Sequence, residues 1–469
     1  MLAVSAPPLY QARRADQSPL YQLLLDHYER FEGVYEDRFS DRLGEWRAVV
    51  GKVFRSFLDC GILAHGFLRV VCRTCHDEIL VPWSCKRQLC PSCGQRRSQE
   101  FADFLPAVTG GTPWAHVVFT LPKLLRPTFL RERRLLRELS RCAWKTLKQG
   151  LRAALGQPDA EPAAVISKAS AGDLGNPNPH LHCVVAHGAW VEDRFVEWPP
   201  RLTAERLEEL FRRRVLAMLV KQQRLTEDTM EKLRAWQHSG FSVFIGDPIG
   251  EEATGSRARL ARYIVKPPVA LERLSYDAAT CQVTYVSVKR GEQKTFTALD
   301  FIAQLSVHIP DFREHTVTWH GRWSNRSRGN RKSLALSPEE QPQPASEDVP
   351  LAPPGRKAFR MAWAELLARV WEADVLTCSR CGGERRIIAA ITKPMLICRI
   401  LQHLGLSSLP RAPDPHLCED RDPVVRARHP LFVETLESES LESESPSDQN
   451  EWPGDPDPGW PMDDPHPED

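Results

Sequence analysis

The spacing of apolar positions divides the chain into segments with different predicted structure. Between residue 18 and about residue 58, apolar side chains such as Leu24 and Tyr28 recur every three or four positions, which predicts helices and defines an N-terminal helical region, residues 1–59. Across residues 106–332, short apolar runs such as WAHVVFTL, HLHCVVAHGAWV and FSVFIG alternate with charged helical stretches. That alternation indicates an α+β fold with an antiparallel sheet.

The C-terminal part of the chain has a different composition. Residues 333–356 are rich in proline and almost free of large apolar side chains, which is typical of a linker. Residues 357–420 begin with an amphipathic helix and continue with LTCSRCGGERRIIAAIT, a cysteine turn that leads into a strand. Residues 421–469 form an acidic tail that contains too few apolar groups to order itself.

The net charge of +1 hides a strong asymmetry. Residues 434–469 contain thirteen Asp or Glu and no Lys or Arg, so removing these thirteen negative charges leaves +14 on the preceding residues. A body this basic suits a polyanion such as nucleic acid, and surface charge for solubility is the alternative. The tail either screens that body when DNA is absent or serves solubility.

The apolar pattern does not predict a membrane or secreted protein. No stretch approaches 18 uninterrupted apolar residues, and the N-terminus lacks the features of a secretory signal. We therefore expect a cytoplasmic, nucleoid-associated protein with no membrane partner. Because the cytoplasm keeps thiols reduced, thirteen cysteines favour metal binding over disulfides.

Cysteines gather in residues 60–105, for which we expect a zinc-binding module that contacts DNA. Three C-x2-C pairs occur in the chain, whereas random placement predicts about 0.4. Cys72 with Cys75 and Cys90 with Cys93 predict one tetrahedral zinc site, since each tight turn directs two sulfurs to the same side. A reduced cluster without metal is the alternative. The module also holds alternative metal ligands and basic residues suited to DNA: Cys85, His65, His76, Lys86, Arg87, Arg96 and Arg97.

A third pair, Cys378 and Cys381, has no clear second pair beside it. It either binds metal with help from other residues or forms a structural turn without metal. The residues that could complete a site are Cys398, Cys418, His403 and His416.

A histidine pair opens the apolar run at residues 176–191, NPNPHLHCVVAHGAWV. In a strand, His180 and His182 face the same side while Leu181 enters the core. Two such imidazoles supply a divalent ion with two ligands and leave positions open for an oxygen of a scissile phosphodiester. Chance supplies about 0.5 H-x-H pairs in a chain of this composition, so ordinary packed or surface histidines are the alternative.

A tyrosine with basic neighbours lies some 80 residues further on, in GSRARLARYIVKPP. Residues 256–266 predict a short helix that ends at two prolines. Tyr263 shares a helical face with Arg259 and Lys266, and Arg262 adjoins it. A phenol surrounded by cations suits attack on phosphate, because the charges favour phenolate and hold the DNA backbone. A tyrosine packed at a helix end is the alternative.

Residues 315–332 interleave aromatic and basic side chains in HTVTWHGRWSNRSRGNRK. Such a pattern is typical of a platform that stacks bases and contacts phosphates, and core tryptophans beside a solvated loop are the alternative. The residues concerned are Trp319, Trp323, Arg322, Arg326, Arg328 and Arg331.

In this order, the motifs resemble the insertion-sequence 91 family of rolling-circle transposases, in particular its common-region branch. The family belongs to the HUH endonucleases, named for histidine, hydrophobe, histidine. The resemblance covers five ordered motifs: LDCGILAHGFLRVVCRTC with SCKRQLCPSC, NPNPHLHCVVAHG, LARYIVKPP, HGRWSNRSRG, and LTCSRCGGERRIIAAIT before ILQHLGL.

The resemblance implies a ferredoxin-like antiparallel sheet with the histidines on a central strand and the tyrosine on a nearby helix. It implies that His180 and His182 hold Mg²⁺ or Mn²⁺, and that Tyr263 attacks a DNA phosphate, keeps the 5′ end as a phosphotyrosine and frees a 3′ hydroxyl. The family's zinc-binding region matches the two N-terminal C-x2-C pairs. Arg259 stands where the two-tyrosine branch has its second tyrosine, so one nucleophile is expected. The third metal ligand typical of the superfamily is not assigned.

We therefore expect a DNA transposase that nicks and rejoins single-stranded DNA at insertion-element ends, with structural Zn²⁺ and catalytic Mg²⁺ or Mn²⁺. The sequence contains no G-x4-G-K-[ST] loop, so unwinding would depend on a host helicase. The alternatives are a plasmid replication initiator or relaxase with the same chemistry, and a non-catalytic zinc-containing DNA-binding protein.

Overall fold

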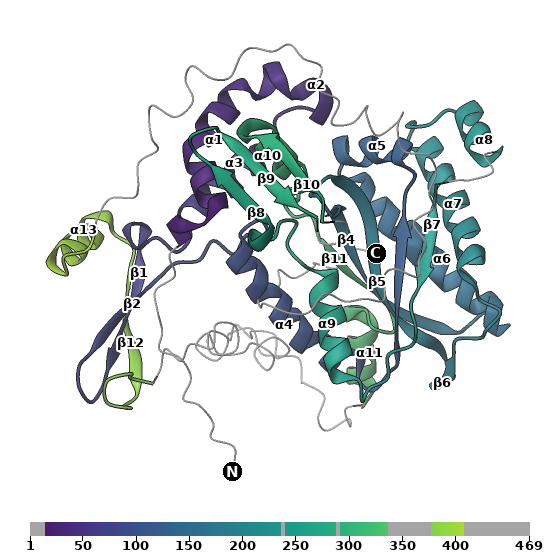
Figure 1. Ribbon diagram of the computed structural model, residues 1–469. Coiled ribbons are helices and arrows are strands. Elements are labelled where there is room, and N and C mark those ends of the chain that lie inside the picture. The colour runs from purple at the N-terminus through teal and green to yellow at the C-terminus, as the bar shows by residue number, and fades with distance from the viewer. Residues whose placement is uncertain (1–14, 236–239, 288–290, 336–376, 408–469) are drawn as a thin grey trace, which may run out of the picture.

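The computed structural model describes residues 15–235, 240–287, 291–335 and 377–407. Its largest sheet is antiparallel throughout, in the order β11-β4-β5-β3-β7, with β6 paired to β5 (Figure 1). These strands are β3 (Trp114–Thr120), β4 (Glu161–Ala171), β5 (Pro177–Val191), β6 (Arg194–Glu197), β7 (Ser242–Ile245) and β11 (Val317–Gly321). The expected α+β class is confirmed, and β5 is a central strand of this sheet.

Helices cover both faces of the large sheet. One face packs against α6 and α7 and the other against α4 and α9 (Figure 1). The bounds are α4 (Pro91–Thr109), α6 (Leu135–Leu155), α7 (Ala204–Lys221) and α9 (Thr254–Ile264). Leu181 and Cys183 of β5 enter the core under α6 and α7, whereas Val184 enters the core under α4 and α9. Because side chains alternate along a strand, His180 and His182 share the face of Val184 and α9.

The N-terminal helices pack on a second, smaller sheet. Leu24 and Tyr28 are buried there, which confirms the predicted helical periodicity. The same core includes apolar residues between Val269 and Ile309, so this part of the expected catalytic domain packs with the N-terminal region. The elements are α1 (Pro19–Arg38), α2 (Ser40–Leu43), α3 (Ala48–Leu58), β8 (Leu274–Asp277), β9 (Gln282–Val286), β10 (Gln293–Thr297) and α10 (Ala298–His308).

A third unit joins the N-terminal cysteine segment to the C-terminal part of the chain. Its sheet has the order β12-β1-β2, and α13 packs beside it. The bounds are β1 (Phe67–Cys72), β2 (Glu78–Pro82), β12 (Arg385–Ile391) and α13 (Pro394–His403). β12 is the strand predicted after the C-terminal cysteine turn. Most of the predicted linker, the amphipathic helix that follows it and the acidic tail lie outside the described residues.

The remaining described elements are short helices and 3-10 turns. They are the helices α5 (Arg126–Arg131), α8 (Glu227–Ala235) and α11 (Asn325–Ala335), and the 3-10 turns Ala15–Gln17, Leu63–His65, Lys123–Leu125 and Leu271–Arg273. Among the described residues, no helix combines the length and apolar character needed to cross a bilayer.

Candidate active site and cysteine clusters

The two histidines of the H-x-H motif converge on one point above the sheet. Both lie on β5, and Nε2 of His180 is 3.0 Å from Nε2 of His182. Two nitrogens bound to one ion at about 2.1 Å and at a right angle would lie about 3.0 Å apart. The strand therefore brings the two imidazoles together at a spacing that fits two ligands of one ion.

A third histidine, His116 of β3, contacts the pair from the neighbouring strand. Its Nε2 lies 3.1 Å from Nδ1 of His182, on the side of that ring opposite His180. β3 and β5 pair so that His116 stands across from Val184, on the same face as His182. Sequence reasoning missed this residue, although WAHVVFTL reads as a strand, because a single sequence does not reveal which strands pair.

The hydrogen bonds of these rings determine which nitrogens are free. Nδ1–H of His180 donates to the carbonyl oxygen of Asn178 at 2.7 Å, so Nε2 of a neutral His180 carries a lone pair. Burial lowers the pKa of His180 to about 4, and burial together with the nearby His180 lowers the pKa of His116 to about 4. The pKa of His182 is also lowered by burial and by both neighbouring histidines. Neutral imidazoles are the form that binds metal.

The donor set fits a divalent cation held by His180 and His182. Metal-bound histidines almost always donate their second ring N–H to a neighbouring acceptor, which fixes their tautomer. Asn178 accepts that bond from His180, and Nε2 of His116 is placed to accept it from Nδ1 of His182. A cation at this point would contact both Nε2 atoms of the pair, and His116 would orient His182.

Tyr263 of α9 lies over the same group. Its ring centroid is 5.0 Å from that of His182 and 6.0 Å from that of His116. Nζ of Lys266 lies 4.4 Å from the centre of the tyrosine ring. The helix ends at Ile264, two residues before the predicted end at residue 266, so Lys266 lies just beyond it.

The expectation that nearby cations favour phenolate is wrong for the protein without DNA. Burial raises the pKa of Tyr263, and the negative charge of Asp173 raises it further. Lys266 stands over the face of the ring, a position that stabilises a cation through the ring's quadrupole. Burial and Asp173 thus oppose ionisation of the phenol, and the nearby cations do not lower the pKa of Tyr263.

The other predicted DNA contacts on α9 differ in their surroundings. Arg259 is exposed and donates to the hydroxyl of Ser256 at 3.0 Å, one turn back on the helix. Arg262 is half-buried, and its Nη1 donates to Oε1 of Gln99 on α4 at 3.3 Å. Arg259 of α9 and Lys266, just beyond the C-terminal end of the helix, are both exposed.

The predicted stacking platform is only partly present. Trp323 is 2% exposed and belongs to the core under α4 and α9, so the assignment of Trp323 to base stacking is wrong. Trp319 is half-buried, and the guanidinium of Arg328 lies 5.6 Å from its ring centre. Arg322 pairs with Glu161 at 3.0 Å and with Asp193, which leaves exposed Arg326 as the more accessible cation of this segment.

The cysteines form two clusters, and their grouping differs from the predicted one. Cys90 and Cys93 lie with Cys60 and Cys85, whereas Cys72 and Cys75 lie with Cys378 and Cys381. The single site predicted from the two N-terminal C-x2-C pairs is therefore wrong. The physical reason is the β1-β2 hairpin. Cys72 and Cys75 lie at its tip, whereas Cys90 and Cys93 follow its open end, and the six-residue strand β1 spans about 20 Å between the two ends.

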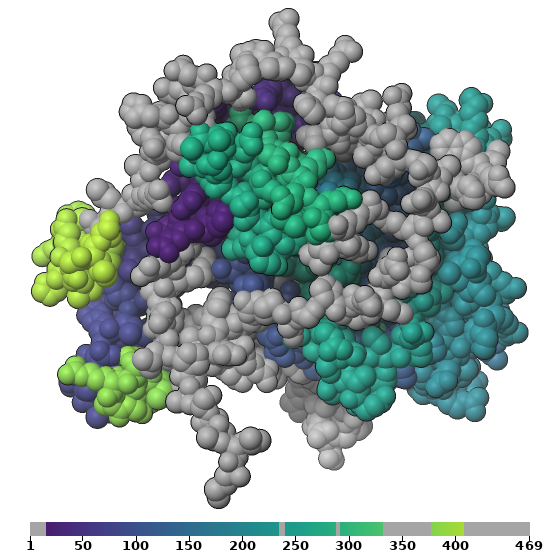
Figure 2. All heavy atoms as spheres, viewed as in Figure 1, coloured from purple at the N-terminus to yellow at the C-terminus, as the bar shows by residue number. Residues whose placement is uncertain are grey.

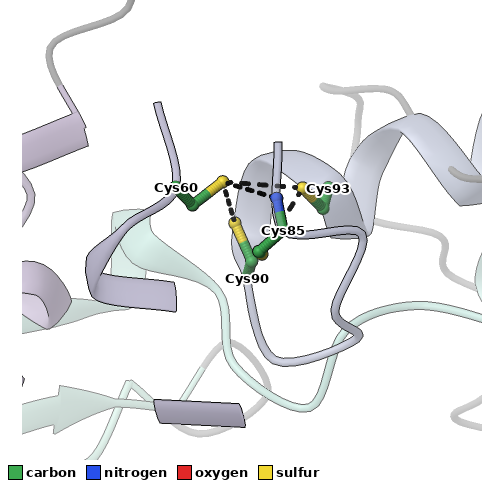
Figure 3. Close-up of side chains that lie close together, drawn as sticks. All are labelled: Cys60, Cys85, Cys90 and Cys93. Atoms are coloured by element: carbon green, nitrogen blue, oxygen red, sulfur yellow. Dashed lines mark hydrogen bonds between the residues drawn. The ribbon is translucent and has the colours of Figure 1, made fainter. Parts of the chain in front are cut away.

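In the first cluster, one cysteine before β1 and three after β2 meet at the N-terminus of α4 (Figure 3). Sγ of Cys60 lies 3.7 Å from Sγ of Cys90 and 3.7 Å from Sγ of Cys93, and Cys85 and Cys93 are also 3.7 Å apart. Four thiolates around a tetrahedral zinc ion at about 2.3 Å lie about 3.8 Å from one another. Backbone N–H of Cys85 points at Sγ of Cys60 at 3.3 Å, which supports a thiolate.

Of the basic residues predicted beside the cysteines, Lys86 and Arg87 lie in the loop between Cys85 and Cys90, and Arg96 and Arg97 lie on α4. Lys86 is exposed and has a left-handed backbone with φ of 54°. Arg87 is half-buried, and its backbone N–H lies 3.5 Å from Sγ of Cys85. Cys398 and His403 belong to neither cluster, and Cys418 and His416 lie outside the described residues.

The chain is similar to known transposases both in its cysteine-rich region and in the sheet that carries the paired histidines. Residues 30–121 match the family model of the transposase zinc-binding domain, and residues 172–331 match a family model described as a putative transposase. The transposase for insertion sequence element IS801 of Pseudomonas savastanoi pv. phaseolicola is 25% identical over 361 residues, which are 71% of this chain and 79% of that protein. No solved structure matches the chain.

These similarities support assignment of the chain to the insertion-sequence 91 family of transposases. The zinc-binding match spans all of the first cysteine cluster and both cysteines at the hairpin tip. The second match includes the histidine pair and Tyr263. The two matches together cover the candidate active site, since His116 lies near the end of the zinc-binding match.

Proposed function

We propose that the protein transposes DNA by nicking and rejoining a single strand through a covalent tyrosine intermediate. The observation that carries this proposal is the position of Tyr263, with its ring 5.0 Å from that of His182 and above the face on which both Nε2 atoms converge. A nucleophile beside two neutral imidazoles that share one point suits attack on a phosphate bound at that point.

His180 and His182 would hold Mg²⁺ or Mn²⁺, and when bound this cation polarises the scissile phosphate and withdraws charge from the departing oxygen. His116 fixes the tautomer of His182 and is a positioning residue. The family's transposase activity supports this assignment, and a zinc ion on the first cysteine cluster would stabilise the start of α4 next to the site.

In the nicking step, the phenol of Tyr263 loses its proton as its oxygen forms a bond to phosphorus and the bond from phosphorus to the 3′ oxygen breaks. The 5′ end stays on the protein and the 3′ oxygen takes up a proton. A returning 3′ hydroxyl reverses these steps and rejoins the strand. Because Arg259 occupies the position of a second tyrosine, one 5′ end is held at a time.

DNA binding would use the exposed cations around this site. Arg259, Lys266 and Arg326 are exposed, and Lys86 extends the basic surface at the first cysteine cluster. Cations of this kind hold phosphates and make affinity fall steeply with salt. We propose a cytoplasmic protein whose partner is single-stranded DNA at the element ends, with unwinding left to a host helicase.

The test is adduct formation on single-stranded DNA from the ends of the element that encodes this chain, in the presence of Mn²⁺. A covalent protein–DNA species that survives boiling in detergent is expected for the native chain and not for Tyr263→Phe. Tyr276→Phe is the matched control, because the Tyr276 hydroxyl bonds to His27 and Asp26, away from the histidine site. A replication initiator or relaxase would give the same adduct but would act on a circle, and a non-catalytic DNA-binding protein would give none.

A further inference from the structure

Four cysteines from two distant parts of the chain meet at one end of the β12-β1-β2 sheet. Sγ of Cys72 lies 3.5 Å from Sγ of Cys381, and Sγ of Cys75 lies 3.5 Å from Sγ of Cys378. All four sulfurs lie within 4.8 Å of one another, and all four residues are free thiols. More than 300 residues separate the paired cysteines in sequence, so the fold alone brings them together.

The sulfur spacing fits a metal better than it fits the alternatives. A disulfide requires about 2.05 Å between two sulfurs, which is far shorter than these separations. Thiolates around tetrahedral zinc lie about 3.8 Å apart, close to the 3.5 Å found here and to the 3.7 Å of the first cluster. Packing of apolar side chains does not require four sulfurs to converge.

The two turns that carry these cysteines have the same backbone geometry. After Cys75, His76 adopts φ of 60° and its N–H donates to the carbonyl of Cys72 at 3.2 Å. After Cys381, Gly382 adopts φ of 72° and its N–H donates to the carbonyl of Cys378 at 2.8 Å. A left-handed residue after the second cysteine closes each turn, so both turns direct their sulfurs to the same side.

Contacts around the cluster hold the two turns against each other. A Cβ at Gly383 would stand 2.5 Å from Oγ1 of Thr74, so only glycine allows this approach. Backbone N–H of Thr74 points at Sγ of Cys72 at 3.4 Å, in the manner of a thiolate acceptor. Arg385 is 3% exposed and pairs with Asp77 of the opposite turn.

We propose that Cys72, Cys75, Cys378 and Cys381 bind a second zinc ion, which fastens the C-terminal module, residues 377–407, to the N-terminal β1-β2 hairpin. Figure 2 shows this module against the cysteine-bearing N-terminal segment at one end of the molecule. The module pairs with the hairpin through β12 and β1, with Phe67 opposite Ile391 and Cys72 opposite Arg385. The proposal is independent of the nuclease chemistry.

The small core of this unit explains why a metal is needed. Its apolar cluster holds four buried residues among those described, and Val70 and Val81 of the hairpin are buried outside that cluster. The four are Phe67, Ile391, Ile397 and Leu401. A core of this size contributes too little to order a strand and a helix on a hairpin, and small units of this kind commonly use a structural metal. Half of the ligands come from each part of the chain, so loss of either half releases the ion and loosens β12 from β1.

The test is the zinc content of the full chain and of matched cysteine variants, measured by plasma mass spectrometry on purified, folded protein. Two zinc ions per native chain are expected. Cys378→Ser with Cys381→Ser is expected to hold one, and amide hydrogen exchange of β1 and β12 should then accelerate. Cys398→Ser is the control in the same module, because Cys398 belongs to neither cluster, and it should keep two ions and native exchange.

Two further variants keep the outcome decisive if the double serine variant does not fold. Cys381→His retains a zinc ligand at the exposed position and should restore two ions. Cys60→Ser with Cys85→Ser removes the first site, and X-ray absorption of the remaining zinc should report four sulfur ligands at about 2.3 Å. One zinc in the native chain, or two in folded Cys378→Ser with Cys381→Ser, would overturn the proposal.

Discussion

Gly94 of α4 lies so close to Pro267 that an added Cβ would stand 2.8 Å from Cγ of the proline ring. Gly94 follows Cys93 of the first cysteine cluster, and Pro267 follows the helix that carries Tyr263. The close approach joins the cluster to the end of the nucleophile helix. A displacement of Pro267 at this contact would therefore shift Tyr263, although Gly94 and Pro267 lie outside the active site.

Gly94→Ala tests this contact against Gly33→Ala. Both glycines are helical, and alanine gains about 0.5–1 kcal/mol of helix propensity at either position. A Cβ at Gly33 meets no atom within 4 Å, so Gly33→Ala should raise the free energy of unfolding. Overpacking against Pro267 costs about 1–3 kcal/mol, so Gly94→Ala should lower that free energy and reduce adduct formation. If Gly94→Ala and Gly33→Ala have equal unfolding free energies in urea, the contact with Pro267 has no effect on stability and the prediction is wrong.

His116→Ala tests the positioning of His182. Loss of the outer partner of a metal-bound histidine typically lowers metal affinity by about 10–100-fold. We therefore expect weaker Mn²⁺ binding by calorimetry in His116→Ala, with adduct formation restored at high Mn²⁺ concentration. In His116→Gln, the amide oxygen can accept from Nδ1–H of His182, so Mn²⁺ affinity should recover in part. His187→Gln is the control on the same strand, since His187 stacks on Trp198 away from the pair. Unchanged Mn²⁺ affinity in His116→Ala contradicts the assignment.

Arg257 should anchor the nucleophile helix to the sheet. The residue is buried, with 3% exposure. Its Nη2 donates to Oγ1 of Thr109 at 3.1 Å and to the carbonyl of Gly110 at 2.9 Å. Its guanidinium lies 3.9 Å from the ring centre of Trp114. Arg257→Ala should lower the free energy of unfolding by about 1.5–3 kcal/mol, the usual worth of hydrogen bonds to a charged group. Exposed Arg259→Ala, two residues away, should change it by less than about 0.5 kcal/mol. Similar losses in the two variants would contradict this role.

His308 should make stability depend on pH. Its Nε2–H donates to the carbonyl of Gly175 at 2.7 Å and its Nδ1 accepts from the hydroxyl of Ser170 at 3.1 Å. Burial, with smaller contributions from Arg133 and Arg47, lowers the pKa of His308 to about 4 although the Gly175 carbonyl opposes this shift. An unfolded histidine has a pKa of about 6.5. As the pH falls from about 6.5 toward 4, the unfolded chain binds a proton at this position and the folded chain does not. The free energy of unfolding therefore decreases over this pH range.

His308→Gln removes this linked proton. In urea titrations between pH 7 and pH 4.5, the unfolding free energy of the variant should fall less steeply than that of the native chain, by at most about 1.4 kcal/mol per pH unit. The variant is expected to be less stable at pH 7, where the two hydrogen bonds of the neutral ring are lost. Parallel pH dependences in the two proteins contradict the prediction.

Local patterns in the sequence predicted the local parts of the site. Alternation at His180, Leu181 and His182 predicted a strand with both histidines on one face, and the paired prolines after Tyr263 predicted the end of its helix. These predictions depend on neighbours in sequence, whose geometry follows from the strand and helix repeats. The α+β class followed from the same repeats.

Partners that lie far apart in the sequence could not be predicted in this way. His116 joins the histidine pair only because β3 lies beside β5, and Cys72 meets Cys381 only because β12 pairs with β1. Spacing identifies a cysteine turn, but a turn supplies two ligands at most, and chain topology determines which second pair completes the tetrahedron. Trp323 was also predicted from local sequence alone: its basic neighbours suit base stacking, but its contacts in the fold place it in the core.

Covalent cleavage leaves DNA on one residue of the protein, and the identity of that residue can be measured. The native chain is incubated with Mn²⁺ and single-stranded DNA of its own element ends, digested with nuclease and protease, and analysed by tandem mass spectrometry. We expect one nucleotide-bearing peptide, with the 5′ phosphate on Tyr263, and a free 3′ hydroxyl on the released strand. A nucleotide on another residue, or cleavage with no covalent peptide from folded protein that binds Mn²⁺, would contradict it.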